Sequence, residues 1–306
     1  MSLNRAEVES WLELPCRELM ARALAVKLSR RGESISLCSI INAKSGQCSE
    51  DCRFCTQSAH YKTDTPVYPL KAADEIVAAA RQAKTDGASH FSLVSSGREI
   101  TPRLLAEITG IITAIREAVD IRVCASLGMA SLRDLQLLQR AGLSRYHHNL
   151  ETSRRFFPRV VTTHGFDDRV RTIEAAHDAG LEVCAGGIIG LGESEADRVS
   201  LALTLEELRV DSVPLNILIP LPGTPMQDVK PLGIHEILRA ISLFRLILPG
   251  VPLRLAAGRE SALRDFMSSA FMAGADGMMI GGYLTQRGRS ATEDQQFVAA
   301  IKNLWA

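Results

Sequence analysis

The sequence predicts an α/β protein that folds as a TIM-type (β/α)8 barrel behind an N-terminal helical extension. Strand-like and helix-like stretches alternate along most of its 306 residues, and eight strands with the helices between them fit the roughly 250 residues of a typical barrel. Glycines follow the expected helices where a left-handed C-cap is needed, at Gly87, Gly142, Gly180 and Gly274. We expect residues 1–32 to form the extension and residues 33–306 the barrel. An open, doubly wound sheet is the alternative.

Each element is predicted from its hydrophobic period. Residues 3–30 are expected to form one or two helices with Pro15 as the boundary, because proline breaks a helix interior. Apolar or alternating runs predict strands over residues 35–41, 89–95, 121–126, 145–150, 181–188, 212–218, 251–257 and 276–281. Amphipathic stretches predict helices over residues 74–85, 102–118, 131–141, 167–179, 194–208, 234–248 and 261–273.

Composition narrows the possible functions. Hydrophobic residues make up 46% of the chain and charged residues 23%, which is ordinary globular usage. Lys+Arg and Asp+Glu number 35 each, so the simplest electrostatic argument for a nucleic-acid partner is absent. No apolar run approaches the roughly 18 residues of a membrane helix, and the N-terminus has no signal-peptide core. We therefore expect a cytoplasmic protein without a membrane partner.

The two faces of the expected strands differ in polarity. Side chains alternate across a strand, and one face carries mostly Leu, Val, Ala and Phe. The other face carries Ser36, Cys38, His90, Ser92, Arg122, Cys124, Arg145, His147, Asn149, Glu151, Glu182, Cys184, Gly186, Pro214, Asn216 and Arg254. Helices cover the outside of a barrel, so the polar face must point inward. This predicts a hollow barrel that holds something polar or metallic. An antiparallel sheet with one wet face is the alternative.

Three of the seven cysteines stand close together, as C-x₃-C-x₂-C at Cys48, Cys52 and Cys55. In a reducing compartment such a group holds metal more readily than it forms disulfides. The motif follows the first strand, at the C-terminal mouth where barrel active sites form. Three thiolates are one too few for a tetrahedral zinc site or for full ligation of a four-iron cluster. An iron left without a thiolate would be useful if it must bind substrate or cofactor. A zinc knuckle completed by His60 or another residue is the alternative.

The spacing and place of this motif resemble the radical S-adenosylmethionine (SAM) superfamily. Residues 146–153, 183–193, 213–216 and 254–260 narrow the resemblance to the biotin synthase family, over about residues 35–284. The resemblance implies a sulfurtransferase that inserts sulfur into dethiobiotin to form biotin, using a 5′-deoxyadenosyl radical. It implies a [4Fe–4S] cluster on the three clustered cysteines, with SAM chelating the open iron. It also implies a homodimer and a reducing electron donor such as flavodoxin or ferredoxin.

The resemblance also assigns contacts to individual residues. Cofactor contacts fall to Phe54 beside the adenine, Arg169 near the SAM carboxylate, Asn149, Glu151, Gly186, Gly187 and Ile188. Asn149 and Asn216 match contacts to the substrate ring, and Glu151 stands where the family often has aspartate. The two glycines let the backbone approach SAM, although a tight strand exit would explain them equally well. No side chain is expected to act as a catalytic acid or base, since radical chemistry comes from the cofactor.

The family also carries a second, sulfur-donating cluster, and here its ligands depart from the usual set. Cys124, Cys184 and Arg254 match three of the four ligands, but the fourth position is Ser92. Serine is a poor ligand for iron. Cys38 lies on the adjacent strand with the same inward alternation, so we infer that the missing thiolate has moved there. The auxiliary cluster is then [2Fe–2S] or a four-iron variant, with Arg254 as a ligand or a neighbour.

Two other functions stay open at this point. Ser92 leaves room for another radical SAM enzyme of the same subfamily, such as a hydrogenase-cofactor maturase or an amino-acid mutase. A non-catalytic metal-binding scaffold would need the clustered cysteines but not Asn149, Glu151 or Asn216. His147 and His148 do not predict a zinc site, because adjacent residues on a strand face opposite sides.

Overall fold

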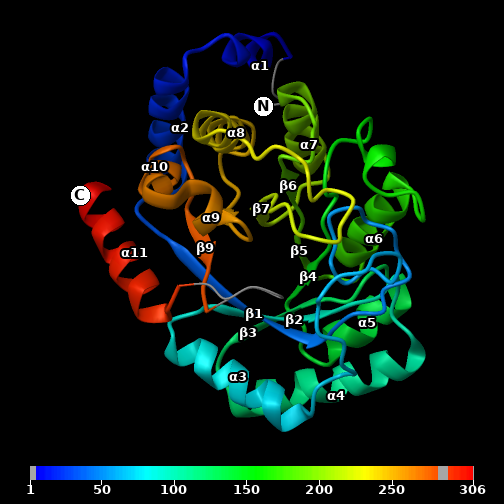
Figure 1. Ribbon diagram of the computed structural model, residues 1–306. Coiled ribbons are helices and arrows are strands. Elements are labelled where there is room, and N and C mark those ends of the chain that lie inside the picture. The colour runs from blue at the N-terminus through cyan, green and yellow to red at the C-terminus, as the bar shows by residue number, and fades with distance from the viewer. Residues whose placement is uncertain (1–4, 282–288, 306) are drawn as a thin grey trace.

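The computed structural model describes residues 5–281 and 289–305. Its nine parallel strands form one curled sheet in the order β5-β4-β3-β2-β1-β9-β8-β7-β6 (Figure 1). The strands are β1 (Ser36–Lys44), β2 (His90–Ser95), β3 (Arg122–Ser126), β4 (Arg145–His147), β5 (Glu182–Cys184), β6 (Gly187–Ile189), β7 (Val213–Ile217), β8 (Leu253–Leu255) and β9 (Gly277–Met279). All eight predicted strands are confirmed, although the one expected over residues 181–188 is split into β5 and β6.

The two edge strands of this sheet, β5 and β6, are consecutive in the sequence, and only Ala185 and Gly186 separate them. The amide of Ala185 donates to the carbonyl of Ser212 at 3.0 Å, and the amide of Ile188 donates to the carbonyl of Glu151 at 2.8 Å. These bonds join β5 to the start of β7 and β6 to the chain beyond β4. They close the curled sheet into a barrel, so the TIM-type prediction is confirmed.

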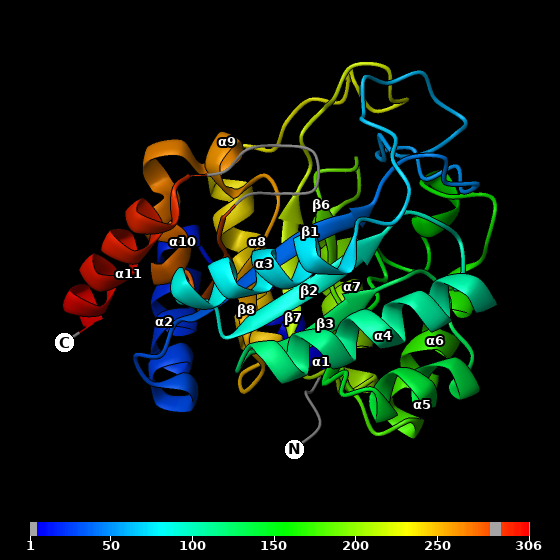
Figure 2. The ribbon, with the colours of Figure 1, turned by 90° about the horizontal axis from the view of Figure 1, so that it is seen from below.

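Helices pack around the outside of the sheet. They are α3 (Ala73–Thr85), α4 (Pro102–Ala118), α5 (Leu132–Arg140), α6 (Phe166–Asp178), α7 (Glu195–Glu207) and α8 (Ile234–Ile247), each within one residue of its prediction at both ends. Figure 2 shows α3 and α4 lying across β1, β2 and β3. Ser131 and Ser194 begin α5 and α7 as capping residues, because each side chain accepts a backbone hydrogen bond from the aspartate three residues later.

Two helical regions differ from the prediction. The single helix expected over residues 261–273 is wrong, since α9 (Arg259–Leu263), a 3₁₀ turn (Arg264–Phe266) and α10 (Met267–Met272) replace it. The break falls at Arg264, whose φ of +46° lies outside the helical range. A further helix, α11 (Ala291–Trp305), has no counterpart among the predicted elements.

The apolar face of the strands packs under the helices, as predicted. Phe91, Val123 and Tyr146 are at most 1% exposed, and α4 contributes Ile108 and Ile112, which are fully buried. Burying each such side chain stabilises the fold by about 1.5–3 kcal/mol. This layer fixes the outward face of the strands and leaves the opposite face to line the interior.

Two helices precede the barrel, α1 (Arg5–Leu12) and α2 (Cys16–Arg31), with Pro15 at the start of α2 as predicted. α2 packs along α8 and meets the C-terminal helix, where the Lys27 ammonium lies 3.0 Å from the centre of the Trp305 ring. The extension is therefore packed onto the barrel. Within the described ranges, no helix has the length and apolar character needed to cross a membrane.

Candidate functional site

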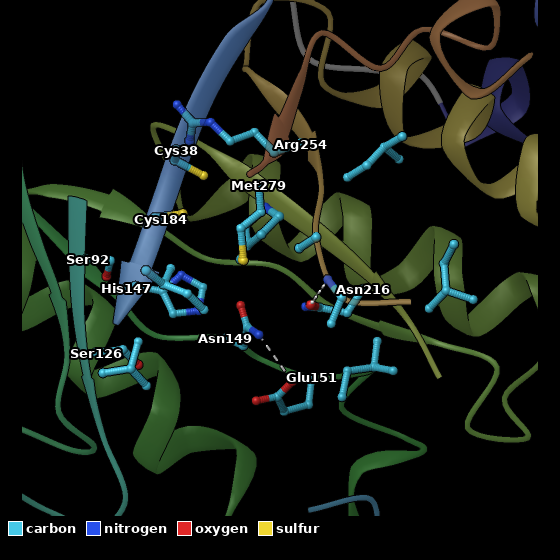
Figure 3. Close-up of a pocket in the computed structure, with 18 of the residues that line it drawn as sticks. Cys38, Ser92, Ser126, His147, Asn149, Glu151, Cys184, Asn216, Arg254 and Met279 are labelled. Carbon is cyan, nitrogen blue, oxygen red and sulfur yellow. Dashed lines mark hydrogen bonds between the residues drawn. The ribbon is translucent and has the colours of Figure 1, made fainter. Parts of the chain in front are cut away.

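The barrel encloses a cavity of about 370 Å³, whereas an ordinary TIM barrel is filled by branched aliphatic side chains. Most of the residues predicted to point inward line this cavity: Cys38, His90, Ser92, Cys124, Arg145, His147, Asn149, Glu151, Cys184, Pro214, Asn216 and Arg254. The prediction is wrong for Arg122, which is exposed, and Ser36, Glu182 and Gly186 do not line the cavity either. Figure 3 shows Cys38, Cys184 and Arg254 toward one end and Asn149 and Glu151 toward the other. The hollow interior predicted from the alternating polarity is confirmed.

Three thiols line this cavity: Cys124 and Cys184 are buried, and Cys38 is half-buried. Burial raises the pKa of Cys38 and raises that of Cys124 to about 12, and the nearby Cys184 adds to both effects. Burial also opposes ionisation of Cys184, but His147, Arg254 and Arg145 together outweigh it and lower the pKa of Cys184 to about 6. Ser92 lies beside Cys124 in the register of β2 and β3. The structure therefore brings Cys38 together with Cys124 and Cys184, on the same wall as the serine.

Arg254 is a buried cation with no acidic partner in the described part of the chain. It is 4% exposed, and its guanidinium donates to the hydroxyl of Ser36 at 3.2 Å and to that of Ser212. Arg145, the other buried arginine of the cavity, is instead neutralised by Glu182. A buried charge without a counter-ion is costly. The cavity beside the three thiols is therefore suited to an anionic group.

The clustered cysteines lie in the loop that follows β1, at the mouth of the barrel as predicted. Backbone bonds shape this loop: Cys48 donates to Gln57 at 3.0 Å and accepts from Ala59 at 2.7 Å, and Cys55 donates to Cys52 at 2.9 Å. A second cavity, of about 190 Å³, is lined by these three cysteines together with Phe54, Asn149, Glu151 and Arg169. The loop thus opens toward the residues predicted to contact SAM.

The donor set of this loop fits a cluster better than a single ion. Among the residues that the structure describes, no three His, Cys, Asp or Glu side chains converge as a single-ion site requires. A four-iron cluster takes each thiolate on a different iron, so its ligands need not meet at one point. His60, the alternative zinc ligand, is hydrogen-bonded to the carbonyl of Ser49 at 3.0 Å. The zinc knuckle therefore has no support here.

Asn149 and Glu151 enter the cavity from the chain beyond β4 (Figure 3). Asn149 donates to Glu151 Oε2 at 3.3 Å, and Arg169 Nη1 lies 3.5 Å from Glu151 Oε1. Burial raises the pKa of Glu151, and the charge of Arg169 opposes that rise. Glu151 has φ +66°, a left-handed conformation that residues other than glycine seldom adopt. Strain of this kind is concentrated at functional sites, which supports the predicted site.

The other predicted contacts surround the same cavity. Phe54 and Ile188 line it. The amide of Asn216 is held at both ends, because it donates to the carbonyl of Gly187 at 3.2 Å and accepts from the amide of Ala257 at 3.1 Å. These bonds fix the orientation of the Asn216 side chain, as a binding residue on a strand requires.

Gly186, just before β6, and Gly187, the first residue of β6, have a structural reason of their own. A Cβ added to Gly186 would stand 2.0 Å from the carbonyl oxygen of Pro214, and one on Gly187 would stand 2.4 Å from that of Glu151. Real Cβ atoms do not approach other atoms so closely. The close passage of neighbouring strands therefore requires glycine here, and the approach of these residues to SAM stays a prediction.

Sequence reasoning missed one group of polar residues at this site. Glu50, in the cysteine loop, is hydrogen-bonded to His164, which is 114 residues further along the chain. His164 in turn accepts a hydrogen bond from Arg169. No spacing in the sequence connects these positions, so only the fold reveals them.

A TIM-type barrel with three cysteines at its mouth and a polar interior is the architecture of a radical SAM enzyme. Residues 44–205 match the family model of the Radical SAM superfamily, and residues 214–302 match the Biotin and Thiamin Synthesis associated domain. A solved methylornithine synthase has a TM-score of 0.81 at 18% identity and covers 98% of this chain and 93% of its own. An FeFe-hydrogenase maturase from Carboxydothermus hydrogenoformans has a TM-score of 0.83 at 20% identity, with coverage of 98% and 75%. At these identities the likeness shows the fold alone.

Curated relatives show to which family of radical SAM enzymes this chain is similar. A biotin synthase from Pelotomaculum thermopropionicum is 49% identical over 285 residues, which cover 93% of this chain and 89% of the relative. A biotin synthase from Desulforudis audaxviator is 48% identical over 301 residues, which cover 97% and 92%. The chain belongs to the biotin synthase family.

Proposed function

We propose that this chain inserts sulfur into dethiobiotin to form biotin, and so acts as a sulfurtransferase. The observation that carries the proposal is the hollow barrel, lined with thiols and polar groups, whose mouth carries the three-cysteine loop. Membership of the biotin synthase family supports the same reaction. The reaction places one sulfur between two saturated carbons. It therefore needs a site that removes two hydrogen atoms and delivers sulfur beside them.

Side-chain acids and bases do not supply this chemistry, because saturated C–H bonds do not release protons near neutral pH. Cys48, Cys52 and Cys55 would hold a [4Fe–4S] cluster that binds SAM, and the pair would supply a 5′-deoxyadenosyl radical able to remove a hydrogen atom. The protein's part is to orient the reactants and to keep water out. Two C–S bonds require two hydrogen removals, so we expect two molecules of SAM to be consumed for each biotin.

The residues near the mouth of the cavity are those that would hold SAM and dethiobiotin. Arg169 presents a guanidinium for the SAM carboxylate, a pairing that planar guanidinium groups favour. Asn149 and Glu151 offer a donor and an acceptor to the ribose and the substrate ring. Phe54 offers an aromatic face for the adenine, and Asn216 reaches the substrate from the opposite wall. Their places around the cavities support these roles.

For the sulfur source we propose an auxiliary iron–sulfur cluster held by Cys38, Cys124 and Cys184. Ser92 stands where the family usually has the fourth ligand, and its hydroxyl is a poor ligand for iron. Cys38 supplies a thiolate from β1 instead. The negative charge of such a cluster would balance Arg254, as a direct ligand or as a neighbour. Both a [2Fe–2S] cluster and a four-iron cluster are compatible with this set.

Several further properties stay predictions. They are the cytoplasmic location, the homodimer, an electron donor such as flavodoxin or ferredoxin, and the absence of nucleic-acid and membrane partners. The division into an extension over residues 1–32 and a barrel over residues 33–306 also stays a prediction.

Anaerobic cleavage of SAM tests the proposed function. Iron-reconstituted enzyme with SAM and dithionite should release 5′-deoxyadenosine faster when dethiobiotin is added. Cys52→Ala should abolish that release, whereas Cys16→Ala, which removes a thiol from α2 outside the site, should behave as wild type. Another radical SAM enzyme would not respond to dethiobiotin, and a metal-binding scaffold would release no 5′-deoxyadenosine. Either of these results contradicts the proposal.

A further inference from the structure

A chain of hydrogen bonds beside the proposed ligands joins the cysteine loop to Arg169. Glu50 belongs to that loop, and its Oε2 is hydrogen-bonded to His164 Nδ1 and, at 2.6 Å, to the hydroxyl of Thr163. On the other side of the imidazole, Arg169 Nε donates to His164 Nε2 at 2.9 Å. Glu50 is 5% exposed and His164 is 9% exposed, so water competes little for these bonds.

These partners determine where the imidazole carries its proton. An arginine Nε always carries a hydrogen, so His164 Nε2 must be the acceptor. The proton of the neutral ring then lies on Nδ1, toward the carboxylate of Glu50. Burial lowers the pKa of His164, and the charge of Arg169 lowers it further, although Glu50 opposes both effects. The neutral ring is the form that this arrangement requires.

Arg169 is the end of the chain that reaches the site. Its Nη1 donates to the carbonyl of Asn149 at 2.8 Å and lies 3.5 Å from Glu151 Oε1. With Nε held by His164 and Nη1 held by Asn149, the guanidinium plane cannot rotate freely. Nη2 has no hydrogen bond within the part of the chain that the structure describes, and it remains for a ligand. The guanidinium therefore faces the cavity in one fixed orientation.

We propose that His164 is a positioning residue that orients Arg169 toward the carboxylate of SAM, and that Glu50 orients His164. The inference rests on the proposed function, since it takes SAM as the ligand of Arg169. A second anchor supports it, because the amides of Thr162 and Thr163 donate to Asp51 of the same loop at 2.9 Å and 3.2 Å. Residues 162–164 thereby hold the cysteine loop and the arginine in one hydrogen-bonded unit.

Equilibrium binding of two ligands to iron-reconstituted His164→Ala enzyme tests the proposal. Loss of one hydrogen bond to a charged group should weaken SAM binding by about tenfold or more. Decarboxylated SAM lacks the carboxylate that Arg169 would hold. His164→Ala should therefore bind decarboxylated SAM with the same affinity as wild-type enzyme does. His164→Gln should recover most of the SAM affinity, because glutamine offers an oxygen to Arg169 and an NH₂ to Glu50. His177→Ala, which removes a ring from α6 outside the network, is the control and should match wild type.

Equal SAM affinity in His164→Ala and wild type would overturn the proposal. So would an equal loss for both ligands, because a merely structural role would weaken both. If the alanine variant does not retain iron, His164→Gln decides the matter: near-wild-type SAM affinity supports the role, and a large selective loss of SAM affinity contradicts it. Failure of the proposed function is distinguishable by a separate measurement on wild-type enzyme. That enzyme would then release no more 5′-deoxyadenosine with dethiobiotin than without it, whatever the SAM affinities of the His164 variants.

Discussion

Ser92 and Cys124 are direct partners in the parallel register of β2 and β3. The hydroxyl of Ser92 therefore occupies the place beside Cys124 where a thiolate ligand would be expected. Cys38 lies one strand further along, on β1, opposite His90. All three side chains line the same cavity. The register gives Cys124 two direct neighbours, Ser92 on β2 and Arg145 on β4, and neither carries sulfur. The thiols that line the same cavity, Cys38 and Cys184, are left to complete the ligand set.

Cys38→Ala should therefore lose the iron of the auxiliary cluster, whereas Ser92→Ala should retain it. Iron and sulfide analysis with Mössbauer spectra of anaerobically purified enzyme makes this comparison. SAM cleavage by Cys38→Ala should persist, because the three cysteines of the loop are untouched. Equal auxiliary-cluster iron in Cys38→Ala and wild type would show that the thiolate has not moved to β1.

Glu151→Ala should slow dethiobiotin-dependent release of 5′-deoxyadenosine by about 100-fold. That loss corresponds to the ~2.7 kcal/mol expected from charge-assisted hydrogen bonds to bound ligands. Glu151→Asp keeps the carboxylate with a shorter reach and should retain part of the rate. Arg209→Ala is the control, since Arg209 also has a left-handed backbone, with φ +53°, but is exposed and away from the cavity. A wild-type rate in Glu151→Ala would show that Glu151 does not bind SAM or the substrate.

Gly186→Ala should destabilise the fold by about 3 kcal/mol, because overpacking against backbone cannot relax easily. The added Cβ would stand 2.0 Å from the Pro214 carbonyl oxygen, whereas a Cβ on Gly110 in α4 would meet nothing within 4 Å. Gly110→Ala should instead stabilise the fold by about 0.5–1 kcal/mol, since alanine favours helix. Apparent melting temperatures compare the two variants. Similar values for both would mean that the passage of the strands at residue 186 is wider than described.

The strands, most of the helices and the polar interior could be predicted from the sequence because they depend on local periodicity. The alternation of Cys124, Arg145 and Asn149 with apolar neighbours predicts one inward face, and the structure confirms it. The break at Arg264 could not be predicted, because a left-handed residue other than glycine leaves no local signal. The break between β5 and β6 differs, because it falls at the glycine pair 186–187, where a tight strand exit could be predicted from the sequence alone.

Contacts between distant segments could not be predicted either. His164 has no partner at a recognisable spacing, and its bond to Glu50 spans 114 residues. Likewise, the serine partners of Arg254 come from β1 and from the residue before β7, which only barrel closure brings together. Sequence patterns supply the candidate ligands, and the fold decides which of them meet.

Asp197→Ala should cost more stability than Asp134→Ala, although both aspartates close a capping box. Asp134 is half-buried and its side chain is hydrogen-bonded, among the residues that the structure describes, to Ser131 alone, so its loss should cost about 1 kcal/mol. Asp197 also accepts from the Ser153 hydroxyl at 2.7 Å and from Arg155 Nε at 3.1 Å, so its loss should cost about 2–3 kcal/mol. Urea unfolding of the two variants measures the difference. Equal losses of stability in the two variants would show that the contacts of Asp197 with Ser153 and Arg155 do not stabilise the fold.

The stability that Asp197 contributes depends on pH in a way that follows from the pKa of its carboxyl group. Burial acts to raise this pKa, but the hydrogen bonds from Ser194, Ser153 and Arg155 outweigh it and lower the pKa to about 2. Because the pKa is lowered in the folded state, the ionised carboxylate stabilises the fold at every pH above the ordinary carboxyl pKa. This stabilisation is lost as the pH falls toward 2. The stability difference between wild type and Asp197→Ala should therefore be constant between about pH 6 and pH 9. A difference that fades within this range contradicts the assigned contacts.

A single-turnover labelling experiment asks whether sulfur held inside the hollow barrel is transferred to dethiobiotin. Enzyme reconstituted with iron and ³⁴S-sulfide is mixed anaerobically with SAM, dithionite and dethiobiotin, and the products are analysed by mass spectrometry. The account predicts ³⁴S-labelled biotin with two molecules of 5′-deoxyadenosine for each biotin. Recovery of unchanged dethiobiotin, or biotin without the label, would contradict it.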